Sequence, residues 1–147
     1  MSIPIRYIPK SLTLQDRKMQ YKNIMKSRKK YNRGIFFQRP KVKSFKSKPS
    51  SHISNAKRMY SIKKFGPTRE LARKTRCTVK ALKKIVSKGE GAYFSSGSRP
   101  NQTAQSWGVA RLASAVSGGK AGRVDYHILK EGCAKNSKAL KLAERLV

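Results

Sequence analysis

The chain has 147 residues, and its 36 Lys and Arg against 6 Asp and Glu give a formal net charge of +30. This length suits one domain of ordinary size and leaves little room for a second. The sequence contains no apolar run of the ~18 residues that a membrane span needs, and no secretory signal is expected. A charge of this size opposes compaction unless the partner is a polyanion or an acidic surface.

The charge is unevenly distributed along the chain. Residues 1–64 hold 19 Lys and Arg with one acid, whereas residues 89–147 hold nine with four acids. Composition shifts in the same direction, from Lys, Ser and Tyr to Ala, Gly and Leu. We therefore expect a mainly α protein. We expect residues 1–64 to form an extended basic N-terminal arm with one or two helices. Residues 65–147 are expected to form a compact helical module with a helix-turn-helix-like hairpin.

The arm is predicted to contain a helix over about residues 13–31, with Asp16 near its positive N-terminal end. Its apolar stripe is thin and consists of Leu14, Tyr21, Ile24 and Met25. Like charges three and four residues apart destabilise an isolated helix. This helix should therefore need a partner to form fully.

Residues 32–52 mix cations with apolar and small residues and should be mostly disordered when alone. The aromatic side chains predicted to dock on a partner are Phe36, Phe37 and Phe45. The cations predicted to contact nucleic acid or another polyanion here are Lys41, Lys43 and Lys46. A second short helix is expected over about residues 53–62.

Residues 68–86 are typical of two short helices joined by a turn, with Thr68 and Thr78 as the two N-caps. Their spacing is that of a DNA-binding helix-turn-helix. The second helix would present Lys80, Lys83, Lys84 and Lys88. Arg76 stands where such a turn commonly has Gly, and a left-handed Arg costs about 1–2 kcal/mol. The second helix lacks Asn and Gln, which makes base reading doubtful. Three interpretations of the hairpin therefore remain: one that only packs in a core, one that binds phosphate, and one that reads sequence.

The segment 88–103 is rich in Gly and Ser, and Gly89 is expected to end the preceding helix. With Arg99 before a helix N-terminus, it is either a structural loop or an anion cradle. The following helix, about 103–117, carries Trp107 as the expected core anchor. Residues 124–129 are ambiguous between strand and helix, and a last helix begins at a cap provided by Asn136 or Ser137.

No catalytic constellation is visible, so no enzyme activity, cofactor, metal or small-molecule substrate is expected. The acids are scattered, and the two histidines lack partners at metal-ligand spacing. Asp125 and His127 are interpreted as a hydrogen-bonding pair. Cys77 and Cys133 are interpreted as small buried apolar residues rather than a disulfide or metal ligands, which favours a reducing compartment.

Several stretches of the sequence carry a resemblance, chiefly Lys88-Gly-Glu-Gly-Ala-Tyr93 and Ser95-Ser-Gly-Ser-Arg-Pro-Asn-Gln-Thr103. Shorter matching stretches are Arg39-Pro-Lys-Val-Lys-Ser-Phe45, Gly118-Gly-Lys120 and Val124-Asp-Tyr126. Over about residues 9–145 the chain resembles a family of small basic proteins encoded by large nucleocytoplasmic double-stranded DNA viruses, including those of algae and amoebae. The resemblance implies a viral context and supplies no catalytic residues.

Charge and resemblance together favour a non-enzymatic minor capsid-associated protein of a virus particle, made in the host cytoplasm or nucleus. Its basic arm would bind acidic or apolar surfaces of larger capsid proteins. The first alternative is a virion core protein that binds and condenses double-stranded DNA, and the second is a helix-turn-helix regulator. Apolar residues between the arm's cations favour the capsid interpretation, because a condensing tail needs few of them.

Overall fold

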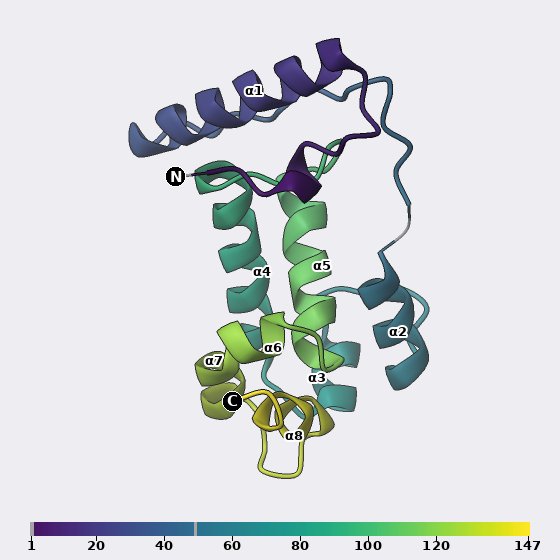
Figure 1. Cartoon of the computed structure of the whole chain (residues 1–147). Coiled ribbons are helices and arrows are strands. Elements are labelled where there is room, and N and C mark those ends of the chain that lie inside the picture. Colours follow the sequence, from purple (N-terminus) through teal and green to yellow (C-terminus); the bar gives the residue numbers. More distant parts are fainter. Residues whose placement is uncertain (1, 49) are drawn as a thin grey trace. The chain divides into compact units, whose positions relative to one another are not determined.

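The computed structural model describes residues 2–48 and 50–147, which form helices and one isolated β-bridge but no strand (Figure 1). The expected mainly α class is therefore confirmed. In chain order the elements are the 3-10 helix η1 (Ile5–Tyr7) and the α-helices α1 (Leu14–Asn32), α2 (Ser51–Tyr60), α3 (Arg69–Thr75), α4 (Val79–Ser95), α5 (Ala104–Val116), α6 (Ala121–Val124), α7 (Tyr126–Gly132) and α8 (Lys138–Glu144).

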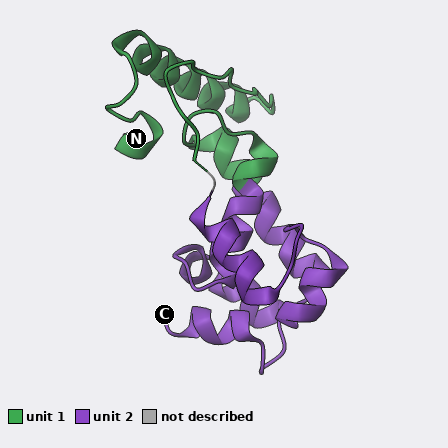
Figure 2. Cartoon of the chain, turned by 90° about the vertical axis from the view of Figure 1, so that its right-hand side faces the viewer, with its two compact units in different colours: residues 1–48, 90–107 green, residues 49–89, 108–147 purple. Residues whose placement is uncertain are grey.

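The chain divides into two compact units that do not follow the predicted boundary at residue 64 (Figure 2). Unit 1 comprises residues 1–48 and 90–107, and unit 2 comprises residues 49–89 and 108–147. Both α4 and α5 supply residues to each unit. The basic N-terminal segment therefore forms its unit together with residues 90–107, and α2 belongs to unit 2 rather than to an arm.

In unit 1, α1 begins and ends within one residue of the expected helix. The Thr13 hydroxyl accepts a hydrogen bond from the Asp16 backbone N–H at 3.2 Å and so caps the first turn. At the other end, Gly34 has a φ of 77°. Its N–H donates to the Tyr31 carbonyl at 2.9 Å, and the Ile35 N–H donates to the Lys30 carbonyl at 2.9 Å. This is a Schellman motif, which glycine favours because of its positive φ.

The buried face of α1 differs from the predicted apolar stripe. Leu14 is 62% exposed and Tyr21 is 54% exposed, whereas Gln20, Ile24 and Ser27 are buried. These three lie four and three residues apart and so share one face of the helix. The two polar members satisfy their groups internally, since Gln20 donates to the Tyr7 carbonyl at 3.2 Å and Ser27 to the Phe94 carbonyl at 3.0 Å.

Unit 1 packs around side chains from the end of α4 and the first turn of α5. Tyr93, Phe94 and Ala104 are buried, with Tyr31 and Trp107 packed against them. Trp107 meets the Tyr7 ring edge-on, with ring centroids 5.8 Å apart. This position agrees with the expected core role of Trp107.

Unit 2 has the larger core, to which α2, α3, α4, α5, α7 and α8 all contribute. Helix α2 confirms the expected second helix, and it buries Ala56 and Tyr60. The Tyr60 hydroxyl donates to the Val116 carbonyl at 2.6 Å, and burial raises the pKa of this phenol well above its usual value. The ambiguous segment 124–129 is helical. Ser137 caps α8 as predicted, accepting from the Leu140 N–H at 3.3 Å.

Gly89 does not end a helix, so this expectation was wrong. Helix α4 continues through Gly89 and Gly91 to Ser95. A Cβ placed on Gly89 would lie 2.6 Å from the Cα of Gly108 in α5. The glycine is therefore required for a close helix crossing rather than for a left-handed cap.

The interpretation of the two cysteines as unpaired was also wrong. Cys77 and Cys133 form a disulfide, with their Cα atoms 3.9 Å apart. The same two residues form an antiparallel β-bridge. Sequence spacing could not predict this pair, because the approach of the α3–α4 turn to the end of α7 depends on the tertiary fold.

The expected Asp125–His127 pair is a third correction. Asp125 is fully buried and accepts two hydrogen bonds from the Arg111 guanidinium, both at 2.8 Å. Lys88 adds an ion pair at 3.2 Å. His127 is exposed. Residues two apart around a helix do not face each other, so the aspartate meets cations from α4 and α5 instead.

Candidate nucleic-acid interface

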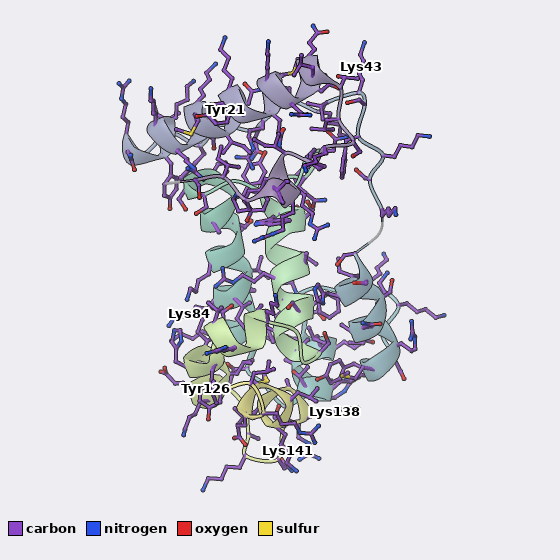
Figure 3. The ribbon with its side chains drawn as sticks, viewed as in Figure 1. Tyr21, Lys43, Lys84, Tyr126, Lys138 and Lys141 are labelled. Carbon is purple, nitrogen blue, oxygen red and sulfur yellow. A yellow bond between two sulfur atoms is a disulfide. The ribbon has the colours of Figure 1, made fainter. Side chains whose placement is uncertain are left out.

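The side of α1 opposite its buried face carries a row of exposed lysines, namely Lys18, Lys22, Lys26 and Lys29. At 1.5 Å per residue the row is about 16 Å long. Residues 17–69 contain no Asp or Glu, so no carboxylate of this stretch offsets the row's charge. Nitrogen-tipped side chains project from α1 in Figure 3, where Tyr21 is labelled on the same helix.

The nearest acid in the sequence, Asp16, is engaged elsewhere. Its carboxylate accepts a hydrogen bond from the Ser44 N–H at 2.9 Å, and the Ser44 hydroxyl in turn accepts from the Thr13 N–H at 3.1 Å. The hydrogen bonds from Ser44 lower the pKa of Asp16. Through these hydrogen bonds, Asp16 and Thr13 hold Ser44, and with it the 41–46 segment, against the start of α1.

Asn101 also holds the 41–46 segment in place. In a left-handed conformation with a φ of 63°, its side chain accepts from the Val42 N–H at 2.8 Å and donates to the carbonyls of Val42 and Phe45 at 3.1 and 3.3 Å. Val42 is buried. The predicted contact residues Lys41, Lys43 and Lys46 are all exposed on this anchored segment.

The Gly-Ser-rich segment proposed as an anion cradle binds cations of the chain itself. Arg39 is 9% exposed. Its guanidinium donates to Ser27 Oγ at 3.0 Å, the Tyr93 carbonyl at 2.7 Å and Ser98 Oγ at 2.8 Å. Oxygens of this segment therefore take part in the internal packing of unit 1, as expected of a structural loop. Arg99, which belongs to this segment, is exposed.

The three aromatic residues predicted to dock on a partner have different environments. Phe37 and Phe45 are half-buried. The Nζ atoms of Lys26 and Lys30 lie 4.8 and 5.1 Å from the centroid of the Phe37 ring. Phe36 is 66% exposed. Phe37 and Phe45 therefore take part in the packing of unit 1, whereas the outer side of the Phe36 ring is exposed to solvent.

The hairpin of unit 2 has the predicted form, with Thr68 and Thr78 capping α3 and α4. Arg76 adopts the left-handed conformation, with a φ of 58°. Neighbouring bonds hold it there: the Ala134 N–H donates to the Arg76 carbonyl at 2.8 Å, and the Thr78 N–H donates to the Gly132 carbonyl at 2.8 Å. These bonds and the disulfide offset the cost of a left-handed arginine.

The end of α7, around Gly132, partly covers the start of α4. Gly132 lies so close to α4 that a Cβ on it would overlap the Ala81 Cβ. Lys80, Lys83 and Lys84 are exposed, but Glu131 lines a groove together with Lys80 and Lys84. Lys88 is engaged with Asp125. This arrangement favours phosphate contact over insertion of α4 into a groove of DNA, and it offers a weaker cationic surface than α1.

Sequence reasoning named the cations of the 41–46 segment but missed the lysine row of α1. The available signal was the recurrence of lysine at intervals of three and four residues, which identifies one face of a helix. The buried contacts of Arg39 had no local signal, because their acceptors lie up to 59 positions away.

No group of three or more His, Cys, Asp or Glu side chains within residues 2–48 and 50–147 could hold a metal ion. In the same described ranges, no helix is long and apolar enough to cross a membrane.

The fold and its surfaces define a small, mainly helical and strongly basic protein. The chain belongs to a family of unknown function (DUF5824), which matches residues 4–134 and so includes residues of both units. No curated protein and no solved structure matches the chain. The family supplies no residue roles, so a function must be argued from the chemistry of the chain.

Proposed function

We propose that this protein binds nucleic acid without reading its sequence, through the lysine row of α1 and the neighbouring cations of the 41–46 segment. The observation that carries the proposal is the row itself, four exposed lysines on one helix face in a stretch of the chain without acids. A phosphate backbone is a regular line of negative charge, and lysines bind it by releasing counterions.

The chemistry of the exposed groups supports backbone contact rather than base reading. Sequence reading in the major groove uses bidentate contacts of Arg or Lys to guanine and of Asn or Gln to adenine, whereas a lysine ammonium binds phosphate as a point charge. The lysine row presents ammonium groups only, and the exposed face of α4 near its start presents Lys80, Lys83 and Lys84. A helix-turn-helix regulator is accordingly the least favoured of the expected functions.

The test compares two triple variants that change the net charge equally. One is Lys18→Gln/Lys22→Gln/Lys29→Gln in α1, and the control is Lys135→Gln/Lys138→Gln/Lys141→Gln, whose lysines are exposed in unit 2. Binding to a labelled oligonucleotide is measured at several salt concentrations. The slope of log K against log salt should become shallower by about 2–3 in the α1 variant, at roughly 0.7–0.9 per phosphate contact. Equal effects of the two variants would reduce the interaction to net charge and overturn the proposal.

A second candidate is the minor capsid-associated protein expected from the sequence. It is supported by the viral resemblance and by the exposed Phe36 and half-buried Phe45 of unit 1. Incorporation into particles then depends on these apolar side chains. The test compares Phe36→Ala/Phe45→Ala with Lys80→Ala/Lys83→Ala/Lys84→Ala, and loss of incorporation only in the lysine variant argues for a DNA-bound core protein instead.

A further inference from the structure

Unit 1 presents one aromatic ring to solvent on a fixed support. Phe36 is 66% exposed, and its ring centroid lies 5.1 Å from that of Phe94 and 6.0 Å from that of Tyr31. Phe94 is itself buried against Tyr93, with ring centroids 5.0 Å apart. The inner side of Phe36 is thus packed on a buried aromatic cluster, while its outer side is open.

The local backbone explains why the ring is held rather than mobile. The Schellman motif at Gly34 reverses the chain after α1, so Ile35 and Phe36 return beside its last turn. Three residues further on, the Arg39 N–H donates to the Tyr93 hydroxyl at 3.0 Å. The short segment that carries Phe36 is therefore fixed at both ends.

Cations lie close to Phe36 in the sequence, and two of them contact its neighbour Phe37. Lys26 and Lys30 approach the neighbouring Phe37 ring, and Arg33 is exposed one residue before Gly34. An exposed aromatic ring among cations and without nearby acids in the sequence is the composition of a site for unpaired bases, in which the base stacks and the backbone is neutralised.

We propose that Phe36 is a stacking platform for an unpaired base, so that the protein prefers single-stranded nucleic acid. This inference rests on the proposed function and names its ligand class. A protein partner fits the site less well, because a typical interface buries about 800 Å² per partner and its centre is depleted in charged residues. Within residues 34–39, all of them described, the exposed large apolar side chains are Ile35 and Phe36. Lys26 and Lys30 lie over the adjacent Phe37 ring.

The probes are a labelled oligo-dT strand, an abasic strand of equal length, and a duplex of the same length. They are measured with the full-length protein at one fixed salt concentration. Wild-type protein should bind oligo-dT about 5- to 160-fold more tightly than the abasic strand, as expected from one stacked base. Phe36→Leu should lose this preference while binding the abasic strand and the duplex unchanged, and Phe36→Trp should retain it.

Ile35→Ala is the matched control, because it removes an adjacent exposed apolar side chain that is not a ring. Unchanged oligo-dT binding by Phe36→Leu overturns the inference, and so does an equal loss on the abasic strand. A wild-type protein that binds the two strands equally also overturns it. If the α1 triple variant weakens binding to every probe while Phe36→Leu has no effect, only the stacking inference fails. If the α1 triple variant has no effect, the proposed function fails.

Discussion

The Arg39 guanidinium lies over the Tyr93 ring, 3.8 Å from its centroid, and donates to the Tyr93 carbonyl oxygen at 2.7 Å. Burial lowers the pKa of Arg39. Among the described residues, no carboxylate forms an ion pair with Arg39. The face of the Tyr93 ring and the neutral oxygens that accept from Arg39 stabilise the charge instead. These contacts join the irregular segment after α1 to the end of α4 within unit 1.

Replacing Arg39 with Met should destabilise unit 1 by about 2–3 kcal/mol, because buried acceptors lose a charged donor. The single tryptophan, Trp107, belongs to unit 1, so its fluorescence during urea denaturation reports this unit. Arg99→Met is the control, since Arg99 is exposed in the same unit, and it should change stability by less than about 0.5 kcal/mol. Equal effects of the two variants would contradict the assigned role of Arg39.

Features set by local chemistry could be predicted from the sequence, and features set by tertiary contacts could not. The caps at Thr68, Thr78 and Ser137 depend on neighbouring residues and were confirmed. The division into units was missed, because residues 1–48 find their partners more than 40 positions away in the 90–107 segment. The row of lysines on α1 was not predicted as a binding face, because its like charges were interpreted only as destabilising an isolated helix.

An isolated fragment of residues 1–64 should be largely unfolded. In the whole chain, Ile24 lies near Gly97, and the 42–45 segment is held by Asn101. The fragment lacks both partners and retains 19 Lys and Arg against one acid, a composition that opposes folding. Circular dichroism at low concentration, with the full chain as reference, should show little helix. A stable helical fragment would contradict this prediction.

Reduction of the Cys77–Cys133 disulfide should lower the stability of unit 2 by about 2–4 kcal/mol, because the bond closes a long loop. The sequence separation of the pair is 56 residues. Thermal unfolding with and without reductant measures the effect, and the double variant Cys77→Ser/Cys133→Ser should be insensitive to reductant. Two free thiols in the denatured but unreduced protein would contradict the bond itself.

The Asp16–Ser44 contact should weaken only at low pH. Hydrogen bonds from Ser44 hold the pKa of Asp16 below its usual 3.8. A lowered folded-state pKa means that the contact contributes stability above the unfolded pKa and loses it as pH falls through the folded value. The Ser44 amide proton should therefore titrate in NMR spectra with a midpoint below 3.8. Asp16→Asn should abolish that titration, and a midpoint above 3.8 would contradict the assigned bonding.

Two glycines of α4 offer a matched pair of alanine substitutions with opposite expected effects. A Cβ on Gly89 would lie 2.6 Å from the Gly108 Cα, whereas a Cβ on Gly91 would lie 3.6 Å from the Tyr31 hydroxyl. Alanine is favoured over glycine inside a helix by about 0.5–1 kcal/mol, so Gly91→Ala should stabilise the protein. Gly89→Ala forces the backbones of α4 and α5 apart in unit 2, and overpacking of this kind costs about 1–3 kcal/mol. Thermal unfolding of the two variants should therefore show midpoints on opposite sides of the wild-type value, and a stabilised Gly89→Ala would contradict the close crossing.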